Sequence, residues 1–311
     1  MSLETAVVLL LLAARPEVLF SFQDAEIGES SAIVDGGDVV FTINDSGDSA
    51  RVFVVDKRNG QTVGITTYGD EDPVDVEALA AGPGDTLWVG DIGDNDAERS
   101  HITVYGIPTP GRGDATVEPT SYEMVYDDGP RDAETLLVHP KTGRMYVVSK
   151  GLLGGTVYAA PKQLREDRTN VLQPVGGAGG LVTDGVFLPD GEHLLLRDYV
   201  SATLVAASDF TPLARFRLPA QEQGEGIGYD GQRVLVSTEG EYAEVRALAL
   251  PPRVLEAMEP TPSATPTPEP GGEVAAADDE APWAKVLPWA LVAGWIVVAA
   301  VGARWVLRRR R

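Results

Sequence analysis

Short apolar runs alternate with turns rich in Gly, Pro and Asp between residues 16 and 253. Runs of this length that contain many Val, Leu, Tyr and Trp residues predict β-strands. The three-to-four-residue spacing of an amphipathic helix is almost missing; a short segment around Leu255 is the exception. The pattern therefore predicts an all-β domain over residues 16–255.

Five segments of this domain align with one another. Each begins with an acidic residue and a short strand, passes through a Gly-containing turn into a second strand, and ends on a polar residue. The five opening residues are Glu29, Glu77, Glu134, Asp184 and Glu225, at intervals of 48, 57, 50 and 41 residues. These intervals suit four-stranded propeller blades of about 40–50 residues. We predict a five-bladed β-propeller, with a six-bladed ring as the alternative and a β-sandwich as the less favoured fold.

The last repeat lacks its outer strand, and the N-terminal part of the domain can supply it. The segment EVLFSFQD, residues 17–24, precedes Glu29 as TVGITTYGD precedes Glu77. A strand that pairs the two ends of the chain would close the ring and remove an open sheet edge.

Both ends of the chain predict export and membrane attachment. Residues 1–15 contain an apolar run typical of an export signal, although Lys and Arg are missing before it. Residues 256–285 are rich in Pro, Thr and acids and predict a disordered stalk. Residues 286–307 are long and apolar enough for a transmembrane helix, and the basic residues 308–311 predict a cytoplasmic C-terminus. The expected location is the cell membrane, with a single span and the large domain outside the cytoplasm.

The charge of the chain narrows the choice of partners. It has 47 acidic and 25 basic residues, a formal net charge of −22, and no cysteine. Such an acidic surface repels nucleic acid and attracts cations. Disulfides and thiolate metal sites are excluded.

The repeats would bring their acidic residues together. The start of each first strand and the end of each second strand share one rim of a propeller. The predicted metal ligands are therefore the five opening residues, Glu29, Glu77, Glu134, Asp184 and Glu225. The predicted ligand-binding residues beside them are Asp45, Asp48, Asn95, Asp198 and Glu239. Crowded carboxylates need protons or a counter-charge, and hard oxygen ligands favour Ca²⁺. A water-lined channel, or turns in which Asp and Gly serve the backbone alone, are the alternatives.

Three motifs, DIGDN, DDGPRDAETLLV and QGEGIGYDG, resemble those of exported, membrane-anchored propeller proteins of actinobacterial type. In architecture the chain is also similar to the calcium-activated nucleotidases and to phytase- and esterase-like propellers. This second resemblance implies a central ion held at Glu29, Glu77, Glu134, Thr183 or Asp184, and Glu225. The nucleotide-contacting motifs of the nucleotidases are missing, so the resemblance does not imply their substrate.

Three functions fit these features. The first is a membrane-tethered propeller that binds a cation and a small anionic ligand or an extracytoplasmic protein. The second is a Ca²⁺-dependent hydrolase of phosphate esters or nucleotides, in which the metal activates water. Its candidate catalytic residues are Asp91, Asp94, Lys150, Arg131 and Arg197. The third is a structural envelope scaffold, and the sequence leaves open whether the protein is an enzyme.

Overall fold

The computed structural model describes residues 16–45, 47–69 and 72–259. In this part of the chain, strands β1 to β21 form four sheets, and the helix α2, Pro252–Met258, follows the last strand. The region is all-β, as the pattern of short apolar runs predicts. Helix α2 buries Val254 and contacts β18, so the helical segment extends three residues past the predicted domain end at residue 255.

The first sheet joins the two ends of the domain. Its strand order is β1-β21-β20-β19, with β1 antiparallel to β21. The bounds are β1 Glu17–Ser21, β19 Gly224–Tyr229, β20 Arg233–Thr238 and β21 Glu244–Ala249. The predicted pairing of an N-terminal strand with the last repeat is thus present.

The second and fourth sheets are antiparallel meanders along the sequence. The second contains β2 Ser30–Asp35, β3 Val39–Asn44, β4 Arg51–Asp56 and β5 Thr62–Tyr68, with β9 Ala115–Val117 added in parallel at the outer edge. The fourth contains β15 Asp184–Phe187, β16 His193–Arg197, β17 Ser201–Ala206 and β18 Pro212–Arg217.

The third sheet has eight strands in the order β11-β12-β13-β14-β10-β8-β7-β6. Its first half contains β6 Val76–Ala81, β7 Thr86–Asp91, β8 Ile102–Pro108 and β10 Thr120–Tyr126. Its second half contains β11 Ala133–Val138, β12 Met145–Ser149, β13 Gly155–Ala159 and β14 Asn170–Ala178. The two halves meet where β10 pairs in parallel with β14.

The predicted fold class, a ring of five or six separate blades, is wrong in how the strands are grouped into sheets. Separate four-stranded blades were expected, but parallel pairing of the outer strands β10 and β14 merges two of them, so the structure has four sheets. Such pairing satisfies backbone groups that two exposed edges would leave open. The predicted transmembrane helix, residues 286–307, lies outside the described residues, and no helix within them is long and apolar enough to cross a membrane. The predicted export segment and basic tail also lie outside them.

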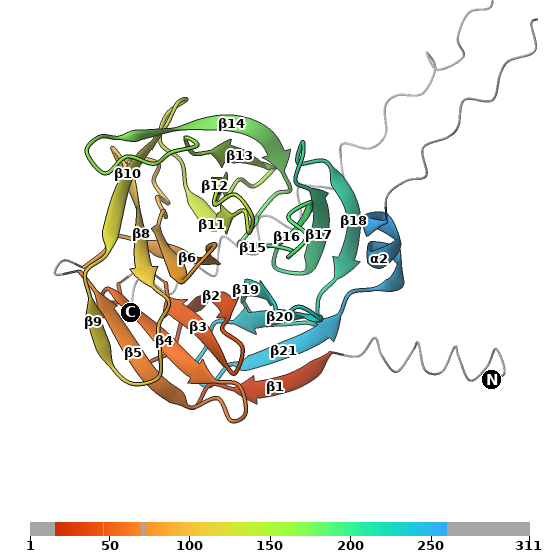
Figure 1. Cartoon of the computed structure of the whole chain (residues 1–311). Helices are drawn as coiled ribbons and strands as arrows, with labels where there is room; N and C mark the ends of the chain where they lie inside the picture. The colour runs from red at the N-terminus through yellow and green to blue at the C-terminus, as the bar shows by residue number, and fades with distance from the viewer. Residues whose placement is uncertain (1–15, 46, 70–71, 260–311) are drawn as a thin grey trace, which may run out of the picture. The chain divides into compact units, whose positions relative to one another are not determined.

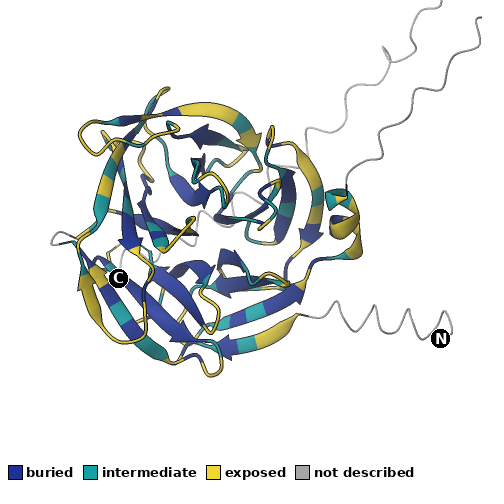
Figure 2. Ribbon diagram, in the orientation of Figure 1, coloured by how far each residue is buried: buried dark blue, intermediate teal, exposed yellow. Residues whose placement is uncertain are grey.

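The sheets are arranged in a propeller-like way around a central axis (Figure 1). Strands β2, β6, β11, β15 and β19 are innermost, and each contacts the next around the ring. Inner strands such as β2 and β3 are buried at nearly every position, because neighbouring sheets cover both faces. Outer strands such as β18 are largely exposed (Figure 2). The inner ends of the sheets therefore meet in one place, and side chains placed there are shielded from water.

The contact between the two ends of the domain is strongly apolar. Phe20 and Phe22 pack edge to face with ring centroids 5.7 Å apart, in one cluster with Phe53 and Val245. The Phe22 amide donates to the Ala243 carbonyl at 3.0 Å, which continues the β1–β21 pairing by one residue.

Shortening Phe22 should therefore weaken the closure. We expect Phe22→Ala to lower the free energy of unfolding by about 3–5 kcal/mol, since a fully buried ring is replaced by a cavity. Leu153→Ala, at a 99% exposed side chain, should have little effect. Urea unfolding followed by circular dichroism measures both; equal stabilities of the two variants would contradict the closure.

Candidate functional site

The candidate site begins with irregularities in the inner strands. The pairing of β6 with β7 shifts between Val76 and Ala78, and that of β11 with β12 shifts between Ala133 and Thr135. The residues between them are Glu77 and Glu134. A β-bulge leaves its extra residue out of the ladder and redirects that side chain. A β-bulge at the start of β6 and of β11 thus positions both glutamates in the same way.

Register shifts at the start of other inner strands show which of the predicted metal ligands also lie in a bulge. In β19 the shift spans Glu225, but in β2 it falls on Ser31. Glu29 lies before β2 and is exposed. Ser31 and Thr183 donate to the carbonyls of Glu77 and Glu225, each at 3.0 Å. The shifted position therefore holds a hydroxyl residue in β2 and glutamates in β6, β11 and β19, whereas Thr183 comes just before β15, whose pairing with β16 has no shift.

Three carboxylates form the tightest acidic group among the described residues. Asp45 follows β3, Asp75 precedes β6, and Glu77 lies in the β6 bulge. One oxygen of each lies within 4.8 Å of the others. Asp75 and Glu77 are buried, with 9% and 4% of their surface exposed. The group brings together two predicted residues, Asp45 and Glu77, and one that the sequence analysis missed, Asp75.

A signal for Asp75 is visible in the sequence. Asp-x-Glu occurs at Asp75–Glu77 and again at Asp132–Glu134, at the start of two successive repeats. Alignment on the glutamates alone hides the aspartate two residues earlier. Asp132 differs in environment, because its carboxylate accepts the Asp94 amide at 3.0 Å.

The DIGDN turn packs its backbone against this acidic group. Its Gly93 donates its amide to the Asp75 carbonyl at 3.1 Å. A Cβ at Gly93 would lie 2.3 Å from Asp75 Oδ2 and 2.9 Å from Glu77 Oε1. The turn therefore needs glycine to bring its backbone against the two carboxylates.

The aspartates of that turn serve the backbone. Asp91 accepts the amides of Val74 and Asp75 at 3.2 and 2.9 Å, and Arg99 donates to it at 2.8 Å. Asp94 accepts the amides of Glu98 and Arg99 at 2.9 and 3.0 Å. Asn95 is exposed. The carboxylates of Asp91 and Asp94 are therefore buried and accept backbone amides, and those of Val74 and Asp75 hold Asp75 in place.

The electrostatics of the group favour protons or a cation. Burial, and then the charges of Asp45 and Asp132, raise the pKa of Asp75 to about 6. Burial, with Glu134 and Asp45 next, raises the pKa of Glu77 well above its usual value. Asp75 Oδ1 is buried and has no hydrogen-bond partner in the described structure. An unsatisfied buried carboxylate oxygen is costly, so it marks a position that a ligand can fill.

A second part of the site has its own counter-charge. Burial raises the pKa of Glu134 to about 8, although Lys150 forms an ion pair with it and acts in the opposite direction. Burial alone would lower the pKa of Lys150, but Glu134 raises it above its usual value. The ammonium also lies 5.5 Å from the centre of the Tyr199 ring. Burial likewise raises the pKa of Glu225.

Glu239 belongs to the same electrostatic neighbourhood. It follows β20 and is partly buried. Burial, with the charges of Glu225, Asp45 and Glu29, raises its pKa to about 7. Of the predicted ligand-binding residues, Asp45 and Glu239 therefore interact electrostatically with the buried acids.

Asp184 and Arg197 hold neighbouring sheets together. Asp184 accepts the amides of Gly185 and Ile227, both at 2.7 Å, which links β15 to β19. Arg197 is fully buried and donates to the carbonyls of Gly226 and Ser237 at 2.8 and 3.2 Å. Burial lowers the pKa of Arg197 to about 10. Both side chains thus form their hydrogen bonds with backbone groups of the protein rather than with a ligand.

The remaining predicted residues make contacts within turns. Asp48 accepts from Asn44 at 2.9 Å and pairs with Arg51. Arg131 pairs with Asp128 at 2.6 Å. The structure does not bring Arg131 to the buried acids.

Asp198 is likewise engaged in a turn. It accepts from the Ser201 hydroxyl at 2.7 Å and pairs with Arg215 at 2.5 Å. Its carboxylate therefore has local partners, as that of Asp48 does.

Comparison with protein-family models finds no match for this chain, and comparison with curated proteins finds none either. The function is therefore inferred from the geometry of the acidic site.

The raised pKa values predict how stability depends on pH. A carboxyl whose pKa is higher in the folded state binds its proton more tightly there, so stability is lost as the pH rises from about 4 through 6. In EDTA, the free energy of unfolding should fall between pH 5 and 7.5, and Asp75→Asn should reduce the slope because an amide does not titrate. Urea unfolding at both pH values measures this.

The exposed Glu166 offers a matched control, since Glu166→Gln should keep the wild-type slope. Carboxyls with lowered pKa, such as Asp190, lose their contribution only below about pH 4 and do not interfere. Equal slopes in Asp75→Asn and wild type would contradict the assignment.

Proposed function

We propose that the protein binds Ca²⁺ through Asp45, Asp75 and Glu77, and uses the charged end of the ring to bind a ligand or partner without turnover. The observation that carries this is Asp75 Oδ1, which is buried, has no hydrogen-bond partner in the described structure, and belongs to a group of three carboxylates. A cation supplies the charge that this arrangement needs.

The spacing of the oxygens suits a single ion. Ca²⁺ binds oxygens at about 2.3–2.6 Å, so two ligands of one ion lie at most about 5 Å apart. The three carboxylates meet that condition with oxygens within 4.8 Å of one another. None of the three is a histidine, and the chain contains no cysteine, so the donor set favours a hard cation over zinc. Waters and backbone carbonyls would complete the coordination.

Binding is better supported than hydrolysis. A hydrolase of phosphate esters needs cations that face the substrate, and Lys150 already pairs with Glu134. Arg197 donates to backbone carbonyls, and Arg131 pairs with Asp128.

Calcium should therefore stabilise the full-length protein. A ligand present at a hundred times its Kd adds about 2.7 kcal/mol, which for a domain of this size corresponds to a rise in Tm of roughly 5–10 °C. We expect this rise at pH 7.5 on replacing EDTA by millimolar Ca²⁺, and its loss in the Asp75→Asn, Glu77→Gln double variant. Glu166→Gln should respond as the wild type does. A wild-type Tm unchanged by Ca²⁺ would refute the site.

Gly93→Ala tests the geometry while keeping every ligand. The added methyl group would fill the space next to Asp75 and Glu77. We expect the Ca²⁺-dependent rise in Tm to fall by at least half, with a folded protein in EDTA. A Gly93→Ala variant that folds and retains the full response would show that the ion does not lie against this turn.

A further inference from the structure

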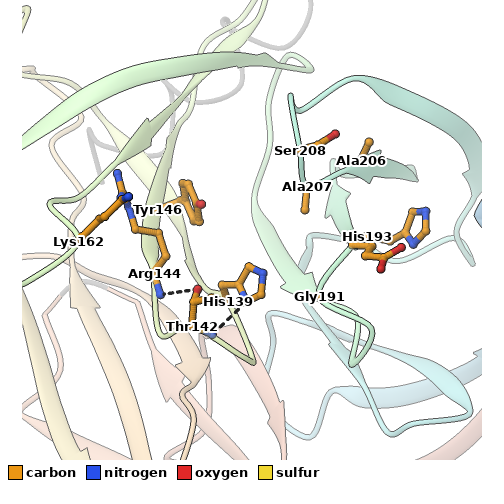
Figure 3. Close-up of a pocket in the computed structure, with 11 residues that line it drawn as sticks. His139, Thr142, Arg144, Tyr146, Lys162, Gly191, His193, Ala206, Ala207 and Ser208 are labelled. Atoms are coloured by element: carbon orange, nitrogen blue, oxygen red, sulfur yellow. Dashed lines mark hydrogen bonds between the residues drawn. The ribbon is translucent and has the colours of Figure 1, made fainter.

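A second pocket lies at the opposite end of the strands from the acidic site. It has a volume of about 830 Å³ and opens between the β11–β14 and β15–β18 strands (Figure 3). His139 follows the end of β11, whereas Glu134 lies near its start, five residues or roughly 16 Å away along the strand. The pocket is thus separate from the proposed cation site, and its volume is in the range of small-molecule sites.

One wall of the pocket is positively charged. It presents Arg144 and Lys162, and neither has a carboxylate within 4.0 Å among the described residues. Most described arginines, by contrast, form ion pairs, as Arg51 and Arg233 do. Arg144 Nε is buried and has no hydrogen-bond partner in the described part of the chain. In so acidic a protein, two cationic side chains without acidic partners favour an external anion.

The same wall offers an aromatic surface. Tyr146 lines the pocket, and the Arg144 guanidinium carbon lies 6.0 Å from the centre of its ring. Phe187 and Phe210 pack against Tyr146, with centroid distances of 6.1 and 5.3 Å, and hold its ring in place. A flat apolar ligand can lie against such a ring while its charged end meets the guanidinium.

Two histidines add hydrogen-bonding groups. His139 Nδ1 accepts the amides of Lys141 and Thr142 at 3.1 and 3.3 Å, so the neutral ring carries its proton on Nε2. His193 lies on the opposite wall, with Nδ1 bonded to Asp190 at 2.8 Å. The exposed Glu192 also lies on that wall, so the positive side of the pocket is the Arg144 side.

We propose that this pocket binds a small aromatic molecule that carries an oxyanion, such as a carboxylate, sulfonate or phosphate. Arg144 and Lys162 hold the oxyanion, and Tyr146 packs against the ring. Glu192 on the far wall excludes ligands with a second negative group at the distal end, because like charges repel.

The test uses the full-length protein and 8-anilinonaphthalene-1-sulfonate, an aromatic sulfonate whose fluorescence rises on binding. We expect saturable binding to the native protein, weakened tenfold or more in Arg144→Gln and only slightly in Arg144→Lys. The matched control is Arg168→Gln, at an exposed arginine paired only with its neighbour Asp167. Arg168→Gln should bind as the wild type does. Circular dichroism confirms that each variant remains folded.

The histidines report where the probe binds. The chain has only three, so the Cε1–H signals of His101, His139 and His193 can be followed with ¹³C-labelled histidine and assigned by single His→Gln variants. The probe should shift the signals of His139 and His193 and leave that of His101, which does not line this pocket.

Several results would overturn the proposal. One is binding that leaves the His139 and His193 signals unchanged; another is equal affinity in wild type and Arg144→Gln. If Arg144→Gln proves unstable, Lys162→Gln decides the question, since Lys162 is exposed and its loss should still weaken the probe at least threefold. Absence of any saturable binding to the wild type would also refute it.

Discussion

The structure depends on how buried carboxylates of like charge are compensated where the inner strands meet. A ring of inner strands gives every repeat a position close to the axis, and bulges place glutamates there in β6, β11 and β19. Ionised carboxylates in such a place cost free energy through both lost hydration and mutual repulsion. Each repeat that places a carboxylate there therefore has to compensate its charge with a proton, a cation or hydrogen bonds.

The repeats answer it in different ways. Glu134 has an ion pair with Lys150. Asp184 accepts two backbone amides, and the bulge position in β2 is held by Ser31, which carries no charge. The Asp75 and Glu77 pair is not fully compensated in any of these ways, because Asp75 Oδ1 has no hydrogen-bond partner in the described structure. This unsatisfied oxygen, within the part of the chain that the structure describes, is the reason for proposing a cation site at Asp75 and Glu77.

The sequence predicted the class of structure better than its connections. Alternating apolar runs and glycine turns are local signals, so strands, repeats and the closing segment at Phe22 could be found. The parallel pairing of β10 with β14 depends on edges that meet only in three dimensions, and the sequence carries no local mark of it. The same holds for Arg197: a cation among acids in sequence suggested an anion site, yet its partners are backbone carbonyls of another repeat.

The site could be predicted as a region but not residue by residue. Aligned acids identified Glu77, Glu134 and Glu225, which the bulges bring inward. Glu29 was preferred to Ser31 because charge was taken as the signal, whereas register decides which side chain enters the ring. The resemblance to calcium-binding propellers stays a prediction, as does the location of the domain outside the cytoplasm on a single-span membrane anchor.

The central claim is that a cation replaces protons on the Asp75 and Glu77 carboxyls. Isothermal titration calorimetry with Ca²⁺, in buffers of different ionisation enthalpy, counts the protons released on binding. The account predicts one ion per chain, with more protons released at pH 5.5 than at pH 8, and a smaller release in Asp75→Asn. Absence of heat at either pH, or binding with no proton release at pH 5.5, would contradict it.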